Sequence, residues 1–97
     1  MENQHIFKLI DGSFSNKDSR EILLNVFTGK IQFHQRKNFS SQERFGKEDE
    51  IALTRIPQLK KSLEDILKLI ETAETRGEQL EIIADVRIKV IKATENV

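Results

Sequence analysis

The stretch EDEIALTRIPQLKKSLEDILKLIETAETRG, residues 48–77, carries the clearest periodic pattern in the chain. Its apolar residues recur at alternating spacings of four and three, namely Ala52, Ile56, Leu59, Leu63, Ile66, Ile70 and Ala73. This spacing is typical of a helix that packs along a second helix. Pro57 removes one backbone hydrogen bond, but the pattern runs through it, so we expect one helix over about 48–76, kinked near Pro57. Gly77 suits the left-handed cap that ends such a helix.

The partner of this helix is expected earlier in the chain. Ser15 is a good N-cap residue because its hydroxyl can accept a bond from a free backbone N–H near Asp18. The apolar residues that follow cover a wide arc of a helical wheel: Ile22, Leu23, Leu24, Val26, Phe27, Ile31 and Phe33. We therefore predict a helix over about 16–37, antiparallel to the second one and joined to it by a tip loop at about 38–47.

Two further segments have the pattern of strands. HIFKLI, residues 5–10, is a short apolar run before Asp11-Gly12, a pair that favours a turn. LEIIADVRIKVI, residues 80–91, places β-branched and other apolar residues at alternate positions, as in a half-buried strand. The tail at 93–97 is expected to fray.

The order of these elements predicts the fold class. A strand, two helices and a strand give an α+β fold, β-α-α-β, with a long antiparallel helical hairpin packed on a small antiparallel sheet. The 97 residues correspond to a single domain, 1–97. The last predicted strand is about twice as long as the first and overhangs it. An unpaired apolar edge favours pairing with another chain, so we expect a homodimer.

Composition narrows the classes of function. The 16 basic and 16 acidic residues cancel, which argues against the strong positive field of a dedicated nucleic-acid binder. The chain has no cysteine, hence no disulfide framework and no thiolate metal site. No segment resembles a signal peptide or a membrane span. We therefore expect a cytoplasmic protein that does not enter a membrane.

No motif of a known catalytic type is present. The sequence contains no nucleophile elbow, phosphate-binding glycine loop, dinucleotide fingerprint or HExxH pattern. His34 falls on the apolar side of the first helix, where a histidine is usually a packing residue. We predict a protein without catalytic activity, cofactor or metal, and rank a small enzyme third among the alternatives.

The predicted tip is the candidate interaction surface. Residues 30–47 hold five basic residues and one acid, Glu43, with phenylalanines interleaved. Basic groups and aromatic rings could bind phosphates and unpaired bases, although the spacing fits no known nucleic-acid motif. Alternatively, Phe39 and Phe45 fold back and close the open end of the hairpin, or they anchor a protein partner. The candidate surface consists of Arg36, Lys37, Phe39, Arg44, Phe45 and Lys47.

The sequence thus favours a small non-catalytic protein-interaction or assembly module that forms a homodimer, with a further protein partner possible at the tip. The second interpretation is a nucleic-acid-associated protein that uses the basic and aromatic residues of 30–47.

Overall fold

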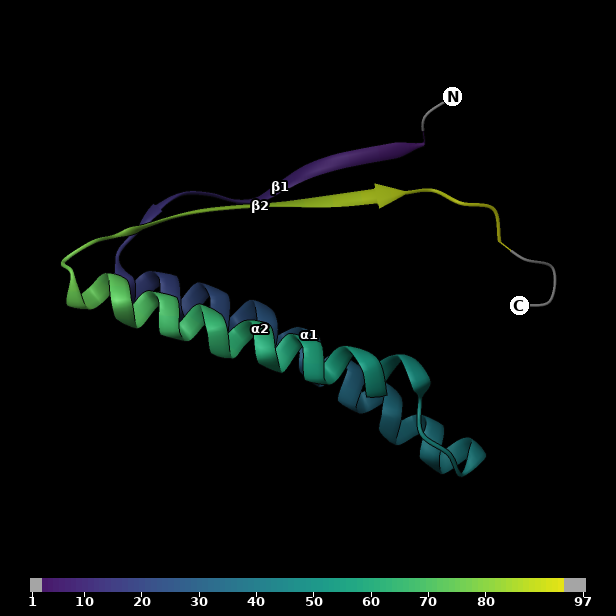
Figure 1. Cartoon of the computed structure of the whole chain (residues 1–97). Coiled ribbons are helices and arrows are strands. Elements are labelled where there is room, and N and C mark those ends of the chain that lie inside the picture. The colour runs from purple at the N-terminus through teal and green to yellow at the C-terminus, as the bar shows by residue number, and fades with distance from the viewer. Residues whose placement is uncertain (1–2, 94–97) are drawn as a thin grey trace. The chain divides into compact units, whose positions relative to one another are not determined.

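A computed structural model of the protein describes residues 3–93 (Figure 1). It contains strand β1 (Gln4–Phe14), helix α1 (Asn16–Phe45), helix α2 (Glu50–Thr75) and strand β2 (Leu80–Lys89). The strands form a two-stranded antiparallel sheet, so the predicted α+β class and the β-α-α-β order are confirmed. The strand pair and the hairpin, Phe14–Leu80, are two compact units. The tail predicted to fray lies almost wholly outside the described residues.

The two helices run side by side in opposite directions along the hairpin (Figure 1). Ala52 and Ile70 of α2 are fully buried, and Leu59 and Ala73 are nearly so. The other three positions of the predicted stripe, 56, 63 and 66, are half-buried. The four-and-three pattern therefore identified the packing face of α2 correctly. Each fully buried Leu or Ile side chain stabilises the hairpin by roughly 1.5–3 kcal/mol relative to exposure.

Polar contacts join the end of the hairpin where α1 begins and α2 ends. The Asn16 side-chain amide donates to the Glu78 carbonyl at 3.0 Å, and Arg20 lies 3.5 Å from the Glu74 carboxylate. Ser15 caps α1 as predicted, because its hydroxyl accepts from the Asp18 N–H at 3.1 Å. These contacts fix the first turn of α1 beside the last turn of α2.

The bounds of helix α2 are close to the predicted ones. It continues through Pro57 and stops where Gly77 takes a left-handed conformation with φ of 69°. The Glu78 N–H then donates to the Ala73 carbonyl at 2.8 Å. This bond satisfies a carbonyl of the last turn. On the solvent side, the hydrogen bond and negative charge of Asp65 raise the pKa of Lys61, four residues earlier.

The predicted end of α1 and the predicted tip loop are wrong. Helix α1 continues through residues 38–45 and ends at Phe45, so only residues 46–49 connect the helices. Ser40 and Ser41 lie within α1 rather than in a loop. The helix ends at Gly46, which has a φ of 68°. This is the left-handed conformation that glycine adopts without steric cost.

The predicted length of the first strand is also wrong. Strand β1 spans 11 residues rather than about six and runs through Asp11-Gly12 without a turn. Gly12 has no positive φ, so it takes part in the strand as extended backbone. Strand β2 has 10 residues and ends at Lys89. The two strands are thus nearly equal in length, and the predicted overhang does not exist.

The helix–helix stripe leads to a stability prediction. Ile70→Ala should lower the free energy of unfolding by about 2–4 kcal/mol, because it removes a fully buried side chain and leaves a cavity. The neighbouring Leu69 is 60% exposed. Leu69→Ala should therefore change stability by less than about 1 kcal/mol. Urea unfolding followed by circular dichroism measures both. Equal effects of the two substitutions would contradict the assignment of the stripe.

Candidate functional site

The short connection between the helices is held by two polar side chains of α1. The Asn38 side-chain oxygen accepts from the Asp49 N–H at 2.7 Å. The Ser41 hydroxyl donates to the Lys47 carbonyl at 2.9 Å. Sequence analysis missed both roles, because polar residues at the end of an apolar stripe resemble the start of a loop. These bonds fix a connection of only four residues, 46–49.

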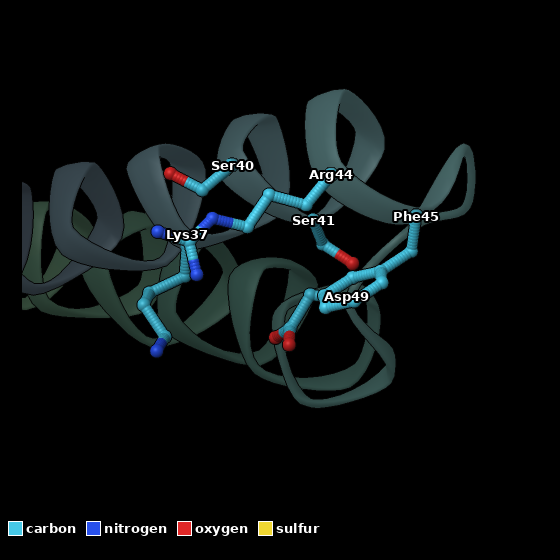
Figure 2. Close-up of a pocket in the computed structure, with 6 residues that line it drawn as sticks. All are labelled: Lys37, Ser40, Ser41, Arg44, Phe45 and Asp49. Atoms are coloured by element: carbon cyan, nitrogen blue, oxygen red, sulfur yellow. The ribbon is translucent and has the colours of Figure 1, made fainter.

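The last turns of α1 form one side of a shallow hollow of about 290 Å³ (Figure 2). Its lining residues from α1 are spaced at i, i+3, i+4, i+7 and i+8, which is one face of a helix. Asp49, from the connection, completes the lining. The full set is Lys37, Ser40, Ser41, Arg44, Phe45 and Asp49. The hollow exists because α1 remains helical up to Phe45.

Charge in the hollow is mixed. The side chains of Lys37 and Arg44 extend along the same side of it, and the Asp49 carboxylate faces it from the connection (Figure 2). Asp49 is already engaged as the N-cap of α2, where its Oδ2 accepts from the Ala52 N–H at 2.9 Å. Arg44 lies in the last turn of α1, where a cation complements the negative end of the helix dipole. Two cations thus face the hollow beside a carboxylate that already has a structural role.

The structure divides the six predicted site residues among three places. Lys37, Arg44 and Phe45 share the hollow just described. Arg36 and Phe39 lie on the adjacent face of α1, where they line a more open surface together with Gln32, Gln35 and Ser40. Lys47 lies in the connection and contributes to neither lining. The six residues are neighbours in the fold but do not form one site.

The interpretation that the two phenylalanines close the end of the hairpin is wrong. Phe39 is 61% exposed and Phe45 is 69% exposed. Both lie on turns of α1 outside the packed stripe, which at this level is occupied by Asn38 and Ser41. The aromatic rings are therefore surface groups of the tip.

His34 is buried between turns of the hairpin, as its place on the apolar side predicts, with 5% of its surface exposed. The ring of Phe33 meets it edge to face, with ring centres 5.3 Å apart. Its Nε2 atom has no hydrogen-bond partner among residues 3–93. A lone buried imidazole without an acid or nucleophile bonded to it lacks the arrangement of a catalytic base.

The strand pair carries a second exposed surface. Eight large apolar side chains on or just beyond the strands are more than a third exposed: Ile6, Phe7, Leu9, Ile83, Val86, Ile88, Val90 and Ile91. Because successive side chains alternate, these residues are divided between the two faces of the sheet; together we call them the strand surface. Large exposed apolar patches on a protein often mark contact sites for other proteins. Only Leu80, Ile82 and Ala84 of β2 are half-buried.

In the stretch that the structure describes, no three histidine or acidic residues are grouped so as to hold a metal ion. None of its helices has the length and apolar character needed to cross a membrane. The chain matches no family model, no curated protein and no solved structure.

The connection between the helices can be tested by one substitution. Asn38→Ala should lower the free energy of unfolding by about 1–2 kcal/mol, because a part-buried N–H loses its acceptor. That N–H belongs to Asp49. Ser40→Ala, two residues away on an exposed position, should change stability by less than about 0.5 kcal/mol. Thermal and urea unfolding of both variants measure the difference. An Asn38 variant as stable as the control would contradict the assigned role.

Proposed function

We propose that the protein is a small non-catalytic assembly module whose partner is a second copy of itself. The observation that carries this proposal is the strand surface. A two-stranded sheet alone is marginally stable in water, and three or more strands or further cover are needed for independent stability. Eight large apolar side chains remain exposed on this one.

The balance of charge supports self-association. Because 16 basic and 16 acidic residues cancel, two copies do not repel each other through net charge. Closed two-fold dimers are also the commonest assemblies of soluble proteins. The predicted strand overhang does not support a dimer, since β1 and β2 are nearly equal in length. The exposed apolar side chains of both strands take its place.

This proposal predicts the mass in solution. Multi-angle light scattering across a concentration series should give twice the 11.3 kDa of one chain at micromolar concentration. A polar substitution on the strand surface, Ile88→Ser, should shift the equilibrium toward the monomer, because Ile88 is 47% exposed in the single chain. Leu53→Ser on α2, 49% exposed, is the matched control and should leave the dimer intact. A wild-type monomer up to high micromolar concentration would contradict the proposed function.

A second candidate function is supported by the hollow at the tip. Lys37 and Arg44 extend along one side of it, and the exposed ring of Phe45 borders it. A pair of cations beside an aromatic ring is an arrangement that can hold a phosphate and stack on an unpaired base. The neighbouring Asp49 carboxylate weakens the positive field there. This is the reason to rank nucleic-acid association second.

Nucleic-acid association predicts salt-dependent binding. A fluorescein-labelled single-stranded oligonucleotide should gain anisotropy with the protein at about 50 mM salt and lose it at about 200 mM, since phosphate contacts release counterions. Lys37→Gln with Arg44→Gln should abolish the low-salt signal. Lys60→Gln, an exposed cation of α2 outside the tip, is the control. No anisotropy change at low salt would exclude this candidate.

A further inference from the structure

The charges of β2 are separated along the strand. Glu81 and Asp85 come first, and Arg87 and Lys89 come last. All four are exposed, and their odd numbering places them on one face of the strand, because successive side chains alternate. One face of β2 is therefore negative toward its start and positive toward its end.

These four charges have no ion-pair partner among residues 3–93. In β1, by contrast, Lys8 and Asp11 satisfy each other at 3.0 Å. Of the two strands, only β2 thus presents charges available to a partner.

The backbone of β2 has a free edge that carries the same residues. The Val90 N–H donates to the Asn3 carbonyl at 3.0 Å across the sheet. Because backbone groups alternate in direction along a strand, the even-numbered residues of β2 bond toward β1. The odd-numbered residues then direct their N–H and C=O groups to the opposite edge. With only two strands in the described sheet, that edge is unpaired.

We propose that two copies of the chain join through these edges, β2 against β2 in antiparallel orientation, with a two-fold axis at Val86. This interface rests on the proposed assembly function and specifies its geometry. The odd-numbered residues form the hydrogen-bonded pairs, so Asp85 of each copy lies opposite Arg87 of the other. The result is a four-stranded sheet in the order β1-β2-β2-β1.

Two other arrangements of the same strands are less favourable. A shift of two residues centres the axis on Asp85 and sets two carboxylates against each other. A parallel arrangement in register aligns acids with acids and bases with bases. Like charges directly opposite each other destabilise a strand pair, whereas opposite charges stabilise it. The Val86 register also pairs Val86 with itself and Ala84 with Ile88 on the apolar side.

Single cysteines test this geometry directly, because the chain contains none. Val86→Cys should form an intermolecular disulfide under mild oxidation, since residues opposite each other in a non-hydrogen-bonded pair have Cα atoms about 4.5 Å apart. Ile83→Cys is the control. Its two copies would be six residues out of register, about 20 Å apart. Ile83 is 65% exposed against 37% for Val86, so random collision would favour the control.

The outcomes separate this inference from the assembly function on which it rests. Rapid cross-linking at 86 and none at 83 supports the Val86 register. A second outcome is a dimer in light scattering for which Asp85→Cys or Ile83→Cys cross-links faster than Val86→Cys. That result overturns the register but not the assembly function. A dimer that cross-links at none of the three positions places the interface elsewhere and overturns the register as well. A wild-type monomer overturns both proposals.

A charge exchange gives an independent test that needs no cysteine. Asp85→Arg sets four arginines around the axis and should raise the dimer dissociation constant about tenfold or more, because two attractive pairs become repulsive. Arg87→Asp should do the same with four carboxylates. The double exchange restores opposite charges and should return the dissociation constant to within about threefold of wild type. A double variant no tighter than the single ones contradicts the pairing of Asp85 with Arg87.

Discussion

The burial of one stripe of α2 against α1 is the interaction on which the hairpin depends. Only a few large side chains carry it, chiefly Ile70, Leu59 and Ile31. Ala52 and Ala73, near the two ends of the stripe, are small enough for the helices to approach closely there. A core this narrow leaves little surplus free energy, because small domains bury a smaller share of their surface than large ones. The ends of the hairpin are accordingly secured by polar contacts rather than by further apolar burial.

The buried stripe of α1 changes character along its length. From Ile31 it continues at spacings of three and four through His34, Asn38 and Ser41, which are polar. At its last two positions, Asn38 and Ser41, the stripe no longer buries apolar surface. These two side chains instead form hydrogen bonds with the backbone of the connection. Those bonds need a donor and an acceptor at fixed positions, so they fix the geometry of the short turn. Phe39 and Phe45 lie outside the buried stripe and are exposed.

This change explains what sequence analysis found and what it missed. The packing face of α2 was predictable because apolar residues alone occupy it, and Gly77 marks its end. The last eight residues of α1 were not predictable as helix, because polar residues at positions of the buried stripe cannot be distinguished by composition from a loop. The first strand was predicted too short for a similar reason, since an aspartate followed by a glycine is typical of a turn. Pairing along the whole of β2 overrides that local preference, and β1 remains extended.

The strand pair poses the opposite problem from the helices, because a free strand edge can pair with further copies of the chain without limit. Charges on an edge strand normally prevent open-ended association. On β2 the separation of acids from bases allows one orientation, antiparallel to a copy of itself, and opposes the parallel stacking that builds fibrils. The proposed two-fold pairing uses the β2 edge of both copies. The outer edges are then those of β1, where Lys8 and Asp11 are already paired within one strand. An edge whose charges satisfy each other offers little to a third copy, so we propose that the assembly closes at two chains.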